Sequence, residues 1–281
     1  MKCFLETKSE ATRFIGSDDP PPFSVINPDI TSGTLLVCDH GGLAIPIALG
    51  DLGLKAVMLE SHISHDIGAA EVTCLLSKRL GVPGILFNYS RLVIDPNRRL
   101  DDPTVIREIS DGIVIPGNRS LDKVDHKERY DALHRPYQHA ITSILKRIEK
   151  RGTIPVVISI HSFTPVMKGY ERPWHVGVLS NVDRRMGDAL MAALSVNKGI
   201  CIGDNLPYSG RSSYGYTIET QAVPRGFPNV LIEIRQDLID SHHGAMEWAV
   251  RIGEALEQVF LDKSLFTSFK ALEDQRNTDK E

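Results

Sequence analysis

Short apolar runs separated by polar turns give this chain the pattern of an α/β protein. Leu35, Leu36 and Val37 form one such run, which turns polar within two residues at Asp39 and His40. Runs of this kind are typical of strands buried on both faces of a sheet. The pattern predicts strands over residues 35–37, 84–89, 154–160, 176–179, 200–202 and 230–234.

Between these runs, apolar residues recur with the spacing of amphipathic helices. The positions from Ala69 to Leu80 mark one helix, which Ser61 or Ser64 would cap at its start. The longest apolar stripe predicts a helix over 125–150, with a kink at Pro136. A short helix or turn is expected over residues 46–55, and further helices over 184–194 and 244–260.

Two polar segments, residues 90–120 and 203–228, lack this periodicity and are interpreted as functional loops. Residues 1–30 include a run of three prolines and are expected to form a loosely packed lead-in, and the tail beyond 270 should fray. The chain shows no internal repeat and no linker. We therefore expect a single domain over 1–281, with α/β/α layers around a mixed, mostly parallel sheet.

Composition narrows the choice of partners. The chain has 32 basic and 36 acidic residues and no dense basic block, so neither nucleic acid nor an anionic membrane is expected as a partner. No apolar run approaches the roughly 18 residues that span a bilayer. Four scattered cysteines without a C-x-x-C pair favour a reducing compartment. We expect a cytoplasmic protein that acts on a small molecule, and the sequence carries no signal for its oligomeric state.

Two histidines follow predicted strands. His40 comes after the first run, where Gly41 and Gly42 would let the backbone come close to a ligand, and His161 comes directly after the third. A single histidine in such a place is more commonly a hydrogen-bonded structural residue. Two at matching strand ends favour a shared site, because ligands gather beyond the carboxyl ends of strands in an open α/β sheet.

A catalytic zinc site takes three protein ligands from His, Asp or Glu. The segment after the first strand offers the third ligand from Glu60, His62, His65 or Asp66. On a helical turn, His62 and Asp66 would share a face, because they are four residues apart. In the alternative interpretation, Asp66 or Ser64 only caps the following helix.

Glu233 stands inside the apolar run 230–234. An acidic residue in a buried strand is costly unless it is paired or belongs to a site. Arg235 could hold it as an ion pair, or it could act as a general base facing a metal-bound water. The loop 203–228, which includes Arg211, would then line or cover the substrate.

The first polar loop carries Asp95-Pro96-Asn97-Arg98, preceded by Arg91. This segment could be an ordinary surface turn. Alternatively, an arginine can bind a substrate carboxylate through two charge-assisted hydrogen bonds, and an asparagine can add a third.

Taken together, these residues resemble the N-formylglutamate amidohydrolase family, over about residues 34–240. The stretches that carry the resemblance are CDHGG (38–42), HISHDIGAAE (62–71), SRLVIDPNRRLDDPT (90–104), SDGIVIPGNRSL (110–121), SIHSFTPVMKG (159–169), RPWHVGVLSN (172–181), GDNLPYSG (203–210) and PNVLIEIRQDLI (228–239). That family is similar in architecture to the zinc carboxypeptidases, so the resemblance implies a zinc-carboxypeptidase-like (phosphorylase/hydrolase-like) fold.

The resemblance also implies roles for individual residues. His40 and His161 would be Zn²⁺ ligands and Glu233 the general base, while Asn97 and Arg98 would hold the substrate carboxylate. Zinc carboxypeptidases take two ligands from H-x-x-E, but the residue three after His40 is Leu43. The acidic ligand must therefore come from elsewhere, and we predict Asp66, with Glu60 and His62 as alternatives.

The function expected from these residues is zinc-dependent hydrolysis of the amide of an N-acyl amino acid, with N-formyl-L-glutamate as the family's reference substrate. Arg91, Arg211 or Arg235 could bind the side-chain carboxylate or the developing oxyanion. Two other functions are open: a zinc amidase or carboxypeptidase for another N-acyl amino acid or peptide, and a metal-free binding protein on the same fold.

Overall fold

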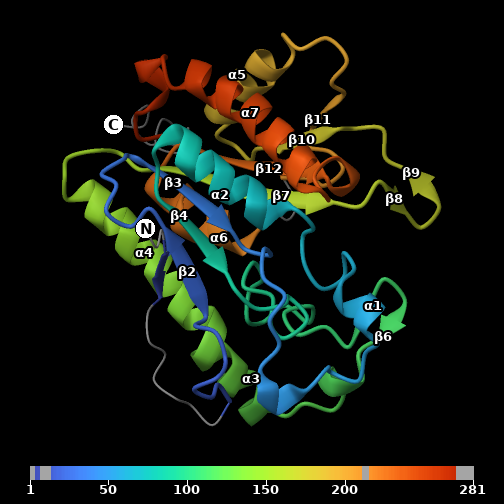
Figure 1. The fold of residues 1–281 in the computed structure, drawn as a ribbon. Coiled ribbons are helices and arrows are strands. Elements are labelled where there is room, and N and C mark those ends of the chain that lie inside the picture. Colours follow the sequence, from blue (N-terminus) through green and yellow to red (C-terminus); the bar gives the residue numbers. More distant parts are fainter. Residues whose placement is uncertain (1–3, 7–13, 211–214, 270–281) are drawn as a thin grey trace, which may run out of the picture.

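Eight strands form one central sheet (Figure 1). The computed structural model describes residues 4–6, 14–210 and 215–269. Across the sheet the order is β1-β2-β4-β3-β7-β12-β10-β11. The strands span β1 (Phe4–Glu6), β2 (Phe23–Ile26), β3 (Thr34–Cys38), β4 (Gly84–Phe87), β7 (Val156–Phe163), β10 (Val176–Leu179), β11 (Ile202–Asp204) and β12 (Asn229–Arg235).

The central strands β4, β3, β7 and β12 run parallel to one another, and β11 is parallel to β10. The other three pairings, β1–β2, β2–β4 and β10–β12, are antiparallel. The sheet is therefore mixed and mostly parallel, which confirms the prediction. Because the four central strands share a direction, their carboxyl ends meet along one edge of the sheet.

Helices cover both faces of the sheet (Figure 1). Leu35 and Val37 of β3 point to one face and Leu36 to the other, and each set lies in a separate apolar core. The first face is covered by α4 (Arg135–Glu149) and α6 (Tyr216–Gln221), and the second by α2 (Ala69–Leu80), α5 (Arg185–Leu194) and α7 (His242–Val259). A shorter helix, α3 (Lys123–Arg129), precedes α4. This confirms the three-layer α/β/α architecture.

Small elements lie outside these layers, on the side of the loops that follow the central strands. They are α1 (Ala56–Leu59), the hairpin β5–β6 (Ile109–Ser110 and Ile113–Val114) and the hairpin β8–β9 (Val166–Met167 and Tyr170–Glu171). Figure 1 shows β8–β9 projecting away from the sheet beyond β7. Among the described residues, no helix is both long and apolar enough to cross a bilayer.

The long helix expected over 125–150 is present but is not uniform. Asp122 caps α3 with a reciprocal pair of hydrogen bonds to Asp125, so the helix starts earlier than predicted, at Lys123. A π-helical turn, Tyr130–His134, separates α3 from α4. Pro136 lies in the first turn of α4 and has no N–H to donate to the carbonyl four residues back. The predicted kink at Pro136 therefore takes the form of a π turn just before it.

The helix predicted to begin at Ser61 or Ser64 is wrong in its first part. Residues 61–68 form a series of turns, and α2 begins only at Ala69. Gly68 has a φ of 77°, and a Cβ at this position would lie 2.1 Å from the carbonyl oxygen of Ile239. The preceding turns are held to the strand ends instead, because the Asp66 N–H donates to the His40 carbonyl at 2.9 Å.

Two expected loops contain regular structure. In the lead-in 1–30, β2 pairs with β4 within the sheet, and Phe23 and Ile26 are buried, so this part is packed rather than loose. The loop 203–228 contains α6 near its end. Short elements of this kind give a weak periodic signal, since their boundaries are set by contacts with the rest of the molecule. The tail beyond 269 lies outside the described residues.

Candidate active site

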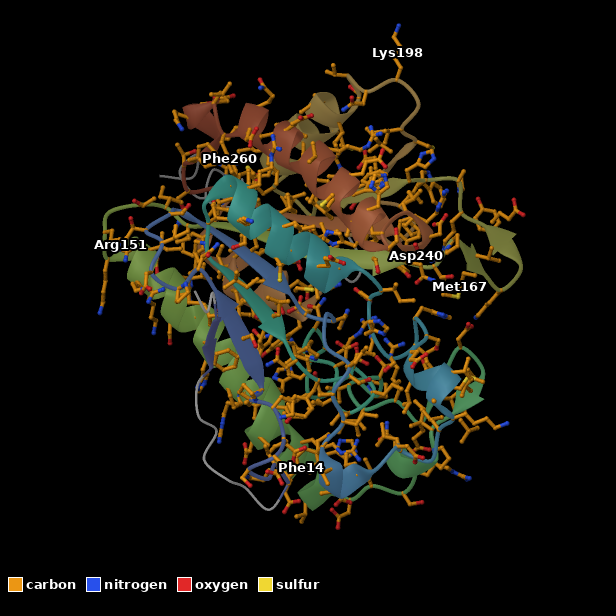
Figure 2. All side chains as sticks on the ribbon, viewed as in Figure 1. Phe14, Arg151, Met167, Lys198, Asp240 and Phe260 are labelled. Atoms are coloured by element: carbon orange, nitrogen blue, oxygen red, sulfur yellow. The ribbon has the colours of Figure 1, made fainter. Side chains whose placement is uncertain are left out.

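A cavity of about 570 Å³ opens at the carboxyl ends of the central strands. Its walls come from the ends of β7 and β12, from the loops that follow β3 and β4, and from Pro207, Tyr208, Ser209 and Gly215. Met167 of the β8–β9 hairpin, labelled in Figure 2, also lines it. Both polar loops singled out in the sequence therefore contribute to one cavity.

Three buried side chains meet in this cavity. Nδ1 of His161 lies 2.8 Å from Asp66 Oδ2, and Nδ1 of His40 lies 3.4 Å from the same oxygen. One ligand atom from each residue fits within 4.8 Å of the other two, and all three residues are at least nine-tenths buried. His40 follows β3, and Asp66 comes from the turns before α2. His161 lies within β7, not after it as the sequence pattern suggested.

A second carboxylate fixes the orientation of His40. Its Nε2 donates to Asp95 Oδ1 at 2.7 Å, so Nδ1 is the nitrogen that faces Asp66. Asp95 is fully buried and also accepts a hydrogen bond from Arg91 at 3.0 Å. Burial alone raises the pKa of Asp95, but the positive charges of His40 and Arg91 outweigh it and hold the pKa well below its ordinary value.

Asp39 plays the same part for His161. Nε2 of His161 lies 3.0 Å from Ser159 Oγ and 3.4 Å from Asp39 Oδ2. Asp39 is itself held by hydrogen bonds from Tyr137 of α4 at 2.9 Å and from Thr217 of α6 at 2.7 Å. This links the orientation of His161 to two helices on the first face of the sheet.

These contacts make the three-residue cluster suitable for a divalent cation. Burial lowers the pKa of His161, but hydrogen bonds with Asp39 and Asp66 outweigh it and raise the pKa to about 10. The carboxylates that stabilise a proton here would also stabilise a metal ion. Metal-bound histidines characteristically donate their other ring N–H to a carboxylate or carbonyl, which is how Asp95 stands to His40. The donor set therefore fits a metal.

Glu233 points into the same cavity from β12. It lies directly opposite His161 in the parallel pairing of β12 with β7, so both side chains are on the same face of the sheet. Its carboxyl group is buried, and Oε2 has no hydrogen-bond partner among the described residues. Burial raises the pKa of Glu233 to about 7, although the nearby His161 opposes this shift. The carboxyl group can thus both accept and release a proton near neutral pH.

Asn97 and Arg98 lie on the wall formed by the loop after β4. The Asn97 side-chain oxygen accepts from the Thr217 N–H at 2.9 Å, which leaves its NH₂ group as the donor available to a ligand. The Arg98 carbonyl accepts from Nε2 of His134, in the π turn, at 3.1 Å. The two residues are therefore positioned from α6 and from the long helix.

Comparison with known proteins shows which family this chain belongs to. A family model described as N-formylglutamate amidohydrolase matches residues 32–240. The chain belongs to the N-formylglutamate amidohydrolase family. Membership supports hydrolysis of an amide bond as the reaction, and it confirms the resemblance that the sequence motifs indicated.

Two solved structures are similar to this member of the family. A crystallised gene product of Agrobacterium tumefaciens is 33% identical, with a TM-score of 0.87 over 90% of this chain and 100% of that one. An N-formylglutamate amidohydrolase from Ralstonia eutropha JMP134 is 18% identical, with a TM-score of 0.66 over 86% of this chain and 98% of that one, and it shares the fold. The search of curated proteins gave no match.

The other arginines predicted to bind substrate lie in different places in the structure. Arg91 lines the cavity, but its guanidinium is already bound to Asp66 at 3.2 Å and to Asp95 at 3.0 Å. Arg235 is not among the residues that line the cavity. It pairs with Asp237 at 2.8 Å, so it neither holds Glu233 nor reaches the substrate space. Arg211 lies outside the described residues.

The alternatives to Asp66 as acidic ligand lie outside the three-residue cluster. Glu60 follows α1 and is not a cavity residue. His62 does line the cavity, but its Nε2 lies 3.3 Å from Asp111 of the β5–β6 hairpin. The helical turn that would have placed His62 and Asp66 on one face is absent, so that argument for pairing them is wrong.

The glycines after β3 have a different role from the one expected. A Cβ at Gly42 would lie 2.0 Å from the carbonyl carbon of Asn88, and one at Gly41 would lie 2.8 Å from Cys38 Sγ. Both residues permit close packing of the loop on its neighbours, not close approach to a ligand. This packing sets where His40 emerges from the sheet.

Sequence reasoning missed the carboxylates behind the histidines and one arginine of the cavity. Asp39 and Asp95 stood next to motif residues, in CDHGG and DPNR, and the available signal was that each directly follows an apolar run. Arg107 also lines the cavity. Its neighbours in the sequence gave no motif, so only the fold reveals it.

Proposed function

We propose that this protein is a metal-dependent amidohydrolase that cleaves the amide bond of an N-acyl amino acid, with N-formyl-L-glutamate as the substrate. The observation that carries the proposal is Glu233, a buried carboxyl group whose Oε2 has no hydrogen-bond partner among the described residues. It shares a cavity with a His-Asp-His cluster suited to a cation. Family membership supports the same type of reaction.

In this proposal His40, Asp66 and His161 hold the metal, and Zn²⁺ suits this set of two imidazoles and a carboxylate. When bound, such a metal polarises a carbonyl and lowers the pKa of a coordinated water. The chain keeps both histidines in the ligand orientation. Asp95 accepts a hydrogen bond from His40 Nε2, while Ser159 and Asp39 contact Nε2 of His161.

Glu233 moves the proton. Its ionised Oε2 takes the proton of the attacking water and then passes it to the nitrogen of the leaving amine. Without that protonation the C–N bond would release a strongly basic amide anion. A carboxyl group with a pKa of about 7 suits both halves of this transfer. Hydrolysis of the formyl amide then yields formate and glutamate.

Asn97 and Arg98 bind the α-carboxylate of the substrate. The guanidinium offers two parallel donors, and the Asn97 amide adds a third. The Thr217 N–H holds the Asn97 side chain, and His134 holds the main chain of Arg98, so both residues are positioned before substrate arrives. Preorganised donors of this kind hold the scissile amide at a fixed distance from Glu233.

The deciding experiment is elemental analysis of untagged protein purified without chelator, with His161→Ala alongside and His139→Ala as control. His139 is exposed on α4, far in sequence from the cavity residues. We expect close to one zinc per chain in the wild type and the control, and loss of zinc in His161→Ala. Absence of metal in all three proteins would refute the hydrolytic mechanism and favour a metal-free binding role.

A panel of N-formyl, N-acetyl and N-succinyl amino acids then identifies the substrate. The proposal predicts the largest kcat/KM for N-formyl-L-glutamate. A larger value for another acyl group or for a peptide would assign the protein to a different amidase or carboxypeptidase activity.

A further inference from the structure

The cavity contains a cation that the proposed mechanism does not use. Arg107 precedes the β5–β6 hairpin and lines the cavity together with Arg91 and Arg98. All three guanidinium groups approach the same oxygen, Asp95 Oδ2. Arg91 hydrogen-bonds to it at 3.0 Å, whereas Arg98 and Arg107 stay at 3.9 Å and 3.8 Å. One carboxylate, already shared with His40, cannot satisfy them all.

Arg107 is the cavity arginine least occupied by protein carboxylates. Its distance to Asp95 is beyond normal hydrogen-bond length, and its Nε is buried without a hydrogen-bond partner among the described residues. Burial, together with the charge of Arg91, lowers the pKa of Arg107. An arginine nevertheless stays charged in proteins, so this position holds a half-buried cation that an anion would stabilise.

The fold keeps Arg107 in place. Its carbonyl accepts from Asn118 Nδ2 at 2.8 Å, and the side-chain oxygen of Asn118 accepts from Arg129 at 2.7 Å. Asn118 and Arg129 are both about 2% exposed. The main chain at Arg107 is therefore tied to α3, so its guanidinium is presented from a fixed base.

We propose that Arg107 is the residue that binds the side-chain carboxylate of the substrate and so makes the site selective for N-acyl amino acids with an acidic side chain. This inference rests on the proposed function and deepens it. Arg98 and Arg107 both line the cavity and lie 3.9 Å and 3.8 Å from Asp95 Oδ2, so each of the two substrate carboxylates would meet its own guanidinium. Two of the three sequence candidates for this role are less suitable, because Arg91 is bound to Asp66 and Asp95 and Arg235 is outside the cavity. The third, Arg211, lies outside the described residues.

Lys168 is the competing cation. It lies in the turn of the β8–β9 hairpin, is exposed, and also lines the cavity. A flexible, hydrated ammonium group at the rim binds carboxylates less selectively than a half-buried guanidinium with two parallel donors. It serves as the internal comparison in the test.

The test compares N-formyl-L-glutamate with N-formyl-L-glutamine, which has the same shape but no side-chain charge. Binding of each is measured by calorimetry to metal-loaded Glu233→Gln protein, which binds without turnover. Into this Glu233→Gln background we add one further substitution at a time: Arg107→Gln, Lys168→Gln or Arg119→Gln. Arg119 is an exposed arginine of the same loop and serves as the control.

We expect Arg107→Gln to weaken binding of the glutamate ligand about 10- to 100-fold, the range for loss of a charged hydrogen-bonding group, and the glutamine ligand by less than about 3-fold. Lys168→Gln and Arg119→Gln should leave the preference intact. Equal loss for both ligands, no loss, selective loss in Lys168→Gln instead, or no binding of either ligand would overturn the inference.

Turnover by the protein with Glu233 intact separates this inference from the proposed function. Selective binding that depends on Arg107, without hydrolysis of either ligand, would support the inference and refute the hydrolase. Hydrolysis with equal kcat/KM for both ligands in wild type and Arg107→Gln would support the hydrolase and overturn the inference.

Discussion

The polar groups of the cavity fall into two sets that differ in how they are paired. In the first set, around the ends of β3 and β7 and the turns before α2, each charged side chain has a protein partner. His40 donates to Asp95, His161 contacts Asp66, and Asp66 also pairs with Arg91. In the second set, Glu233 Oε2 on β12 and Arg107 Nε on the loop after β4 are buried without a hydrogen-bond partner among the described residues. In the function proposed above, the first set holds an ion and the second acts on the substrate.

This difference distinguishes residues that fix the geometry of the site from residues that act on the substrate. A group whose partners are all protein atoms fixes geometry, and its loss disturbs what it holds. A buried group without such a partner carries a desolvation cost in the resting protein, and that cost is offset only when a ligand or a proton arrives. Substitutions in the first set should therefore change metal binding, and substitutions in the second set should change turnover or substrate binding.

The largest effect is expected for Glu233→Gln. Loss of a general acid–base group should lower kcat by about 10²- to 10⁴-fold, with KM changed little, because glutamine has the same shape but cannot take a proton. Metal content should stay at the wild-type level. Unchanged turnover would show that another group is the base. Loss of metal would show that Glu233 belongs with the residues of the first set, which hold the ion.

The same substitution should stabilise the metal-free protein at high pH. The pKa of the Glu233 carboxyl group is about 7 in the folded chain against an ordinary value of 4.5, so folding is penalised when pH rises above 4.5 and the penalty is complete above pH 7. At pH 8, Glu233→Gln should raise the free energy of unfolding by about 3 kcal/mol, and at pH 5 by less than about 1 kcal/mol.

Urea unfolding of metal-free protein at the two pH values measures this difference. Glu247→Gln, on the exposed surface of α7, is the matched control and should show no comparable gain at pH 8. A gain at Glu233 that does not change with pH would contradict the raised pKa.

A smaller effect, on metal affinity, is expected for substitutions in the first set. Asp95→Asn keeps the shape but removes the charge that orients His40, and loss of such a supporting group typically lowers metal affinity about 10- to 100-fold. Competition with a chelator measures that affinity. Asp101→Asn, an exposed carboxylate of the same loop, should have no effect. If Asp95→Asn bound metal as tightly as wild type, the orienting role of Asp95 would be wrong.

The sequence predicted the core strands and main helices because their signals are local. The buried run around Leu36 and the stripe on α4 have the periods of the elements they form. Segments held by distant contacts were predicted poorly. The turns at 61–68 follow bonds from Asp66 to His40 and from Arg91 to Ser64, which no local pattern encodes.

The candidate site divides in the same way. His40, His161 and Glu233 could be found because polar residues at the ends of apolar strands, or within them, are conspicuous. Arg107 could not, because a charged residue in a polar loop is the ordinary case. Only its position beside Asp95 distinguishes it, and that position depends on Asn118 and Arg129, which hold its main chain to α3.

The π turn at residues 130–134 has a consequence for how this protein tolerates changes in chain length. A π turn holds one residue more per hydrogen-bonded ring than an α turn. With that residue, His134 reaches the Arg98 carbonyl while Tyr137 still packs on the sheet side and bonds Asp39. Deleting one residue here would rotate everything before it by about a third of a turn relative to α4. The helix would remain regular, but Arg98 and Arg107 would no longer be supported from it, so a change in length distant from the substrate would act as a change in specificity.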